Sequence, residues 1–155
     1  MHALFRRFTC YWWGNMLRKV FVYGSLRTDM FNYEKYLKGE VLESTSAKIK
    51  GNLFHIENKG YPAIFGGDSE IIGEVFSFHD FSKCIRTLDG MENFNPESPE
   101  SSEYLRQSTT AYLSNGQTEE VYYYHYNPNA SLNSNDKLVP VDSGDWLEYM
   151  LQTVE

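Results

Sequence analysis

The stretch KVFVYGSLRTD, Lys19 to Asp29, decides how the rest of the chain is interpreted. Its apolar run, residues 20–22, predicts a short buried strand over residues 19–23. The strand stops abruptly at Tyr23-Gly24-Ser25, and a polar segment with helical character follows. Glycine followed by serine is typical of a loop whose backbone comes close to another group and points its N–H groups outward. We therefore expect an anion-binding loop after the first strand, with a plain strand-to-helix turn as the simpler alternative.

The composition is that of a globular protein with much β structure. The chain has 155 residues, enough for one domain with a sizeable core, and 41% of them are hydrophobic and 23% charged. Aromatic residues make up 16%, which favours strands because rings pack well on pleated surfaces. The formal net charge is -7 and no cluster of Lys and Arg interrupts it, so nucleic acid is not expected as a partner.

The cysteines and histidines do not indicate a metal site. Cys10 and Cys84 form no CxxC pair, and Cys84 lies on the apolar side of a predicted helix, as a buried inert thiol would. The histidines, at positions 2, 55, 79 and 125, lack the spacing of metal ligands. Without a disulfide framework or an export signal, a cytoplasmic location is expected.

The first fifteen residues, MHALFRRFTCYWWGN, differ from the rest. Their apolar stretch is short and is interrupted by Arg6 and Arg7, so it fits neither a signal peptide nor a membrane span. We interpret residues 1–15 as an N-terminal extension and residues 16–155 as a single domain, a monomer or weak homodimer without membrane association. The alternatives are a membrane-surface anchor built from Phe8, Trp12 and Trp13, or a segment that recruits a partner.

The remaining pattern predicts an α+β protein. Period-two stretches predict strands over 44–58, with Gly51 as a bulge or a point of close approach, and over 70–78, with a separate short extended piece over 60–68. Helices are predicted over 28–39, capped by Thr28 or Asp29, over 80–92, capped by Asp80, and after Ser143 or Asp145. Residues 104–127 form a hairpin that turns at Ser114-Asn115-Gly116. The loops over 95–103 and 127–137 are polar, and the acidic residues of the former are expected in solvent. Glycines inside strands favour a small, mixed and mostly antiparallel β-barrel with a few flanking short helices.

Six motifs now occur in a recognisable order. They are VFVYGSLRTDMFN, GYPAIFGGD, IIGEVFSF, LDGMENF, YLRQSTTAYL and VDSGDW. Together they resemble the gamma-glutamylcyclotransferase-like family of small barrel proteins, from about Lys19 to Trp146. The resemblance implies a barrel with flanking helices and a cavity at one end.

The resemblance also implies the residues of a site. The loop after the first strand would hold a substrate carboxylate through its backbone N–H groups, the glutamate of the LDxxE segment would transfer protons, and a tyrosine on a late strand would close the pocket. In this chain these residues are Tyr23, Gly24, Ser25 and Leu26 for the loop, Glu92 for the glutamate, and Tyr124 or Tyr126 for the tyrosine, between which the sequence does not choose.

The reaction implied by the family needs neither cofactor nor metal. A γ-glutamyl amine or related small amide would cyclise to 5-oxoproline and release the free amine, because its own α-amine attacks its γ-carbonyl. One feature favours a second hypothesis, a small-ligand-binding protein without catalysis. Asn93 and Phe94 follow Glu92 where the family commonly has glycine and tyrosine, and a larger residue there could narrow the cavity or shift Glu92.

Overall fold

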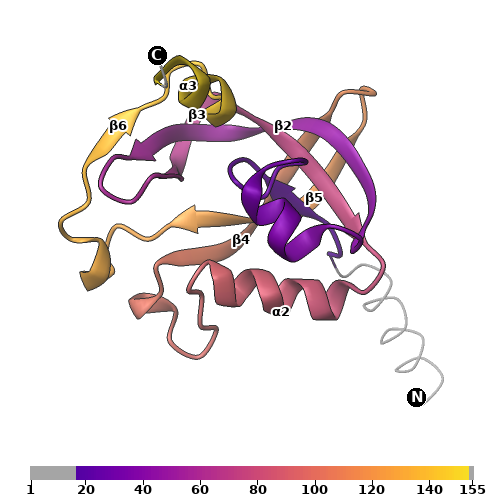
Figure 1. Cartoon of the computed structure of the whole chain (residues 1–155), viewed down its shortest axis with the longest axis horizontal. Helices are drawn as coiled ribbons and strands as arrows, with labels where there is room; N and C mark the ends of the chain where they lie inside the picture. The colour runs from indigo at the N-terminus through magenta and orange to yellow at the C-terminus, as the bar shows by residue number, and fades with distance from the viewer. Residues whose placement is uncertain (1–16, 154–155) are drawn as a thin grey trace, which may run out of the picture.

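The computed structural model describes residues 17–153 (Figure 1), and the strand predicted at residues 19–23 is β1 (Val20–Val22) within it. The extension expected at residues 1–15, with its alternative roles and Cys10, lies outside the described residues. The other elements, in chain order, are η1 (Tyr33–Leu37), β2 (Val41–Ile56), β3 (Tyr61–Phe78), α2 (Phe81–Met91), η2 (Pro99–Ser101), β4 (Tyr104–Leu113), β5 (Thr118–Tyr126), η3 (Ser131–Asn133), β6 (Leu138–Pro140) and α3 (Trp146–Thr153).

The strands form one sheet that closes on itself. Their order is β3-β1-β5-β4-β2-β6, and β2 also pairs with β3, which closes the first five strands of this order into a barrel. β1 and β5 run parallel, and the other pairings between the described strands are antiparallel. The short β6 adds to β2 outside the closed ring. The predicted fold class, a small mixed β-barrel with few helices, is confirmed.

One part of the strand prediction was wrong. The pieces expected at 60–68 and 70–78 are a single strand, β3, which pairs with β2 on both sides of an irregularity. The pairing shifts between Lys50 and Asn52, so the irregularity predicted at Gly51 is present. A Cβ atom added to Gly51 would lie 2.9 Å from Cδ1 of Ile71, so this glycine is also a point of close approach. Four residues of β3, 66–69, lie opposite Gly51 alone, and both strands bend there. Glycines in this segment therefore mark a bend within a paired strand, not its end.

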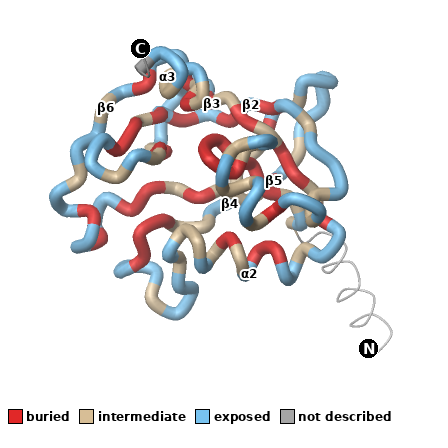
Figure 2. The backbone as a smooth tube through the Cα atoms, viewed as in Figure 1, coloured by how far each residue is buried: buried red, intermediate tan, exposed pale blue. Residues whose placement is uncertain are grey.

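β1 is buried on both of its faces. Val20 and Val22 pack in one core cluster with the apolar side of α2, whereas Phe21 and Tyr23 pack in a second cluster with Trp146. Successive side chains of a strand point in opposite directions, so each face of β1 meets a different cluster. Figure 2 shows the result: the backbone is buried along β1 and the central strands, and it is exposed at the outer turns.

The helix α2 begins and packs as its sequence predicts. The Asp80 side chain accepts a hydrogen bond from the N–H of Lys83 at 3.2 Å, which confirms Asp80 as its N-cap. Cys84, Ile85 and Leu88 form its buried side. The predicted inert thiol of Cys84 is buried and free. In Figure 1, α2 runs along the outside of the barrel.

The helix predicted over residues 28–39 is shorter than expected. Its regular part is η1, a π-helical segment, and its N-cap residue, Asn32, makes no side-chain cap bond. Thr28 does not cap it either, because its N–H and hydroxyl both donate to the Glu74 carboxylate on β3. Asp29 has a φ of 69°, a left-handed conformation that aspartate tolerates, so it belongs to a turn before the helix.

The C-terminal half follows its turn chemistry. β4 and β5 form the predicted hairpin, with Gly116 at a φ of 89° in the turn. Of the two caps proposed for the last helix, the Asp145 carboxylate accepts from the N–H groups of Leu147 and Glu148 at 3.1 and 3.3 Å. No helix within residues 17–153 is long and apolar enough to cross a bilayer.

Candidate active site

The loop after β1, Tyr23 to Leu26, has free N–H groups. The carbonyl of Ser25 accepts hydrogen bonds from the N–H groups of Asn32 and Tyr33, both at 3.1 Å. Among residues 17–153, by contrast, no acceptor takes the N–H groups of Gly24, Ser25 or Leu26. Adjacent backbone donors without partners form the kind of concave site that binds anions.

Packing holds this loop in place. A Cβ atom added to Gly24 would lie 2.7 Å from Cγ of Pro62, so only glycine lets the two chains approach this closely. The carbonyl of Pro62 accepts from the Tyr104 hydroxyl at 2.7 Å, which ties that contact to β4. Oγ of Ser25 accepts from Nδ2 of Asn32 at 2.7 Å. Since that oxygen accepts from Asn32, the hydroxyl proton of Ser25 remains available to a ligand.

A cavity of about 330 Å³ lies beside the loop, and it brings together most of the predicted site residues. All four loop residues line it, and so do Glu92, from the end of α2, and Tyr124, from β5. Residues 23 and 92 are far apart in the sequence, so the barrel creates this proximity. The sequence also pointed to Tyr126, which is not among the lining residues.

Of the two candidate tyrosines, Tyr124 lines the cavity and Tyr126 has other partners. The Tyr23 hydroxyl donates to the carbonyl of Tyr124 at 2.6 Å, and the Tyr124 hydroxyl donates to Oδ1 of Asp89 at 2.7 Å. The Tyr126 hydroxyl donates instead to Oδ2 of Asp136 at 2.6 Å, and Asp136 is in turn paired with Lys59. Tyr124 and Tyr126 lie two residues apart on β5, about 6.6 Å along the strand, so their hydroxyl groups reach different partners.

Glu92 carries a carboxyl group that prefers its proton. Its side chain is half-buried, and it makes no hydrogen bond or ion pair with the described residues. Burial, and secondly the negative charge of Glu103, raises the pKa of Glu92 to about 8. After burial, the charge of Glu92 in turn helps to raise the pKa of four tyrosines, so these rings are within its electrostatic range: Tyr23, Tyr61, Tyr104 and Tyr124.

The residue after Glu92 has a conformation that explains its identity. Asn93 has a φ of 52°, in the left-handed region. Its N–H donates to the carbonyl of Gly90 at 3.2 Å, and the N–H of Phe94 donates to the carbonyl of Asp89 at 2.9 Å. This pair of bonds is a Schellman motif, in which glycine is preferred and asparagine is the usual substitute. Asn93 therefore preserves the helix end that a glycine would form, and Glu92 still lines the cavity.

The prediction of solvated acidic residues over 96–103 was wrong for Glu103. Its relative exposure is 4%, and it lines the same cavity as the loop. Oε2 of Glu103 accepts from Nζ of Lys59 at 3.0 Å and from the Tyr61 hydroxyl at 2.5 Å, while Oε1 accepts from Nδ2 of Asn93 at 2.9 Å. Burial alone raises the pKa of Glu103, but these three hydrogen bonds and the charge of Lys59 outweigh it and lower the pKa.

Sequence reasoning missed Lys59, Tyr61 and Glu103 for a common reason. Lys59 lies in the turn between β2 and β3 and Glu103 lies just before β4, in segments whose polar composition is typical of exposed loops, and Tyr61 begins β3 directly after that turn. One signal was available, since Glu103 directly precedes a hydrophobic strand. The charge of a loop residue does not indicate whether that residue has a buried partner in the folded protein.

The arrangement supports proton transfer beside an anion site. The cavity is lined by the loop with its free backbone donors, by the protonatable carboxyl group of Glu92 and by several tyrosines. In the part of the chain that the structure describes, no group of three or more His, Cys, Asp or Glu residues could hold a metal ion. A carboxyl group that can exchange its proton, in one cavity with backbone donors that can hold an anion, is suited to acid–base chemistry.

A closed mixed barrel with this loop and cavity has the gamma-glutamylcyclotransferase-like fold, and comparison of the sequence identifies the family. Residues 20–148 match the family described as "Gamma-glutamyl cyclotransferase, AIG2-like", so the chain belongs to it. A Methanocaldococcus jannaschii protein named "Putative gamma-glutamylcyclotransferase MJ1514" is 28% identical over 137 residues, which cover 84% of this chain and 96% of the relative.

Solved structures show the same fold. The crystal structure of YkqA from Bacillus subtilis superposes with a TM-score of 0.62 at 25% identity, over 90% of this chain. This chain corresponds to only 44% of the length of YkqA. An AIG2-like protein from Mus musculus superposes with a TM-score of 0.57 at 18% identity, over 79% of this chain and 86% of the mouse chain.

Proposed function

We propose that this protein is a cyclotransferase that converts a γ-glutamyl amine, or a related small amide, into 5-oxoproline and the free amine. The observation that carries the proposal is the position of Glu92. Its unpaired carboxyl group and the free N–H groups of Ser25 and Leu26 line one cavity. A γ-glutamyl group carries a carboxylate for the loop and an amine for the carboxyl group.

In the proposed reaction, the N–H groups of Ser25 and Leu26 bind the α-carboxylate of the substrate. Glu92 takes a proton from the α-ammonium group, and the amine nitrogen then attacks the γ-carbonyl carbon. A new C–N bond closes the five-membered ring, and the bond to the departing amine breaks as Glu92 gives the proton it took to the nitrogen of that amine. The ring nitrogen loses a second proton as it becomes the lactam N–H, and this proton passes through the Glu92 carboxylate to the released amine, which leaves as an ammonium ion. The nucleophile is part of the substrate, so positioning supplies much of the acceleration and no covalent enzyme intermediate is needed.

The raised pKa of Glu92 suits this double role. A group with a pKa of about 8 exchanges its proton readily near neutral pH, whereas an ordinary glutamate would remain ionised and would be a poor acid. Tyr23 and Tyr124 stay neutral because burial raises the pKa of each. They shape the cavity wall and, in this proposal, do not compete for the proton.

The conformation of Asn93 bears on the alternative, a binding protein without catalysis. That alternative was motivated by Asn93 and Phe94, which stand where the family commonly has glycine and tyrosine. In the structure Asn93 adopts the left-handed conformation that this helix end requires, and Glu92 lines the cavity. Nothing in this helix end disables the carboxyl group.

The test is the formation of 5-oxoproline by purified protein from a panel of γ-glutamyl amides. The informative variant is Glu92→Gln, which keeps the shape of the side chain but cannot exchange the proton. Glu97→Gln is the matched control, because Glu97 is an exposed acid of the neighbouring loop. We expect turnover by the wild type and the control, and a loss of about 10²-fold or more in Glu92→Gln.

Two results would contradict the proposal. One is equal turnover by Glu92→Gln and the wild type, which would remove Glu92 from the reaction. The other is thermal stabilisation by γ-glutamyl compounds without any turnover, which would establish the binding protein instead.

A further inference from the structure

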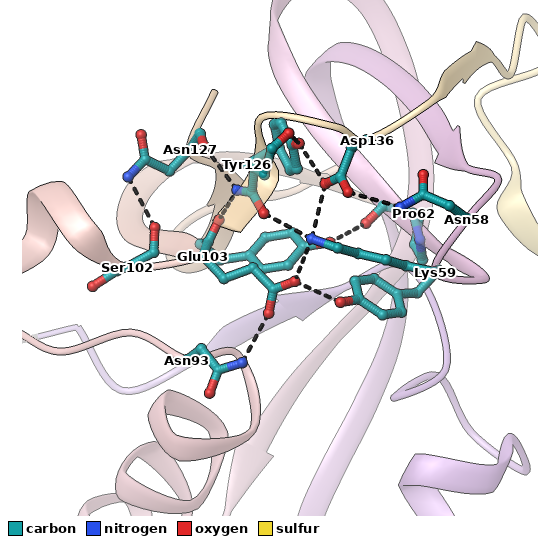
Figure 3. Close-up of polar contacts among 12 residues, drawn as sticks. Asn58, Lys59, Pro62, Asn93, Ser102, Glu103, Tyr126, Asn127 and Asp136 are labelled. Carbon is teal, nitrogen blue, oxygen red and sulfur yellow. Dashed lines mark hydrogen bonds and ion pairs between the residues drawn. The ribbon is translucent and has the colours of Figure 1, made fainter. Parts of the chain in front are cut away.

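Lys59 lies at the centre of a buried polar cluster that joins separate parts of the chain (Figure 3). Its Nζ donates to Oε2 of Glu103 at 3.0 Å and to Oδ1 of Asn133 at 2.8 Å, and it lies 2.9 Å from Oδ2 of Asp136. The side chains of Glu103 and Asp136 are only 5% and 3% exposed. The cluster therefore fastens the loops before β4 and before β6 to the β2–β3 turn.

Glu103 connects this cluster to the end of α2 through two hydrogen bonds to one residue. Nδ2 of Asn93 donates to Oε1 of Glu103 at 2.9 Å, and the N–H of Glu103 donates to the carbonyl of Asn93 at 3.0 Å. Figure 3 shows the Asn93 side chain pointing at the Glu103 carboxylate from the helix end. We call this paired contact the Asn93–Glu103 clamp.

The clamp affects Glu92, the residue that directly precedes Asn93 in the chain. The Glu92 side chain has no polar partner among the described residues, so its direction depends on the backbone from which it projects. That backbone is the last turn of α2, which Asn93 ends in a left-handed conformation. Because Glu103 binds both the side-chain amide and the carbonyl of Asn93, the Glu92 carboxyl group can occupy fewer positions.

We propose that Asn93 and Glu103 are positioning residues for Glu92, with the clamp holding the proton-transfer carboxyl group in the cavity and the Glu103 carboxylate keeping a negative charge beside it. The inference rests on the proposed role of Glu92 and extends it to two residues that make the clamp. It gives Glu103 a function beyond its hydrogen bonds with the buried cluster.

The electrostatic part of the inference follows from the groups that face Glu92. The charged ones are Glu103, before β4, and Lys59, from the β2–β3 turn, which line the same cavity. The other titratable groups in range are neutral tyrosines, one each from β3, β4 and β5 and one from the loop after β1, of which the first is half-buried and the others are buried: Tyr61, Tyr104, Tyr124 and Tyr23. Glu103 is therefore the negative charge that opposes ionisation of Glu92.

The test uses two clamp variants, Glu103→Gln and Asn93→Gly, with Glu97→Gln as the control. Glu103→Gln removes the charge, so the acidic limb of the pH profile of kcat/KM should move to lower pH. Asn93→Gly keeps the left-handed backbone but loses the side-chain bond, so kcat should fall on the order of tenfold with KM changed less than twofold. The control should match the wild type in both measurements.

A second measurement does not need turnover. The Glu92 carboxyl group is titrated by carbon-detected NMR in the wild type and in Glu103→Gln, and we expect a lower titration midpoint in the variant. An unchanged midpoint, or superimposable pH profiles, overturns the electrostatic role even if the enzyme is active. A lowered midpoint in a protein that turns over no γ-glutamyl compound supports it while the proposed function fails. If Glu103→Gln does not fold, wild-type kcat in Asn93→Gly overturns the clamp.

Discussion

Replacing Glu92 with glutamine should stabilise the fold and abolish activity in the same protein. The pKa of Glu92 rises from the usual 4.5 to about 8, which means that the folded protein binds this proton more tightly than the unfolded chain does. The stabilising contribution is therefore complete below pH 4.5 and is lost as the pH rises to about 8. Glutamine, like the protonated acid, carries no charge at any pH, so the Glu92→Gln variant does not lose this stability as the pH rises.

The size of the effect follows from the two pKa values. Each pH unit between them costs the folded protein about 1.4 kcal/mol, because folding must take up a proton that the unfolded chain has released. For a fully desolvated Glu92 the loss of stability would be about 3 kcal/mol at pH 7 and about 5 kcal/mol above pH 8. The side chain is half-buried, so about half of this is expected after solvent screening, or ~2 kcal/mol at pH 7. For a chain of this length, that corresponds to a rise in Tm of roughly 4–8 °C.

The assay is thermal unfolding of the wild type, Glu92→Gln and Glu97→Gln in buffers from pH 4.5 to pH 9. The Tm difference between Glu92→Gln and the wild type should be near zero at pH 4.5, grow with pH and level off above pH 8. Other titrating groups are shared by both proteins, so the difference reports on Glu92 alone. A difference that is absent, or that is the same at every pH, would show that the Glu92 carboxyl group is not desolvated, and the argument for its acid–base role would fail with it.

Other predictions concern the loop, the buried cluster and the two tyrosines. Gly24→Ala should lower stability by about 1–3 kcal/mol and raise KM, because its Cβ would meet Pro62; melting curves and kinetics measure both. Lys59→Met should cost about 3–5 kcal/mol in urea unfolding, since it leaves two buried carboxylates unpaired, and a loss below 1 kcal/mol would contradict the cluster. Tyr124→Phe should reduce kcat/KM, whereas Tyr126→Phe should cost only about 1 kcal/mol of stability and leave kinetics unchanged.

Local chemistry made several parts of the fold predictable. Asp80 before an apolar helical pattern indicated α2 and its cap, and Asn115-Gly116 indicated the β4–β5 hairpin. The glycines near residue 66 misled the strand prediction, because a bend in a paired strand and the end of a strand have the same local composition. Whether β3 continues past the bend depends on its pairing with β2, which no local pattern reports.

By itself, the sequence determined the elements whose signals lie within a few residues, and its ordered motifs indicated the family, the loop after β1 and Glu92. Only the tertiary structure decided that Tyr124 and not Tyr126 lines the cavity, and that Glu103 is buried against Lys59. The physical reason is that the fate of a tyrosine or a charged side chain depends on partners from distant segments. Those partners are brought together when β2 and β3 pair and close the barrel.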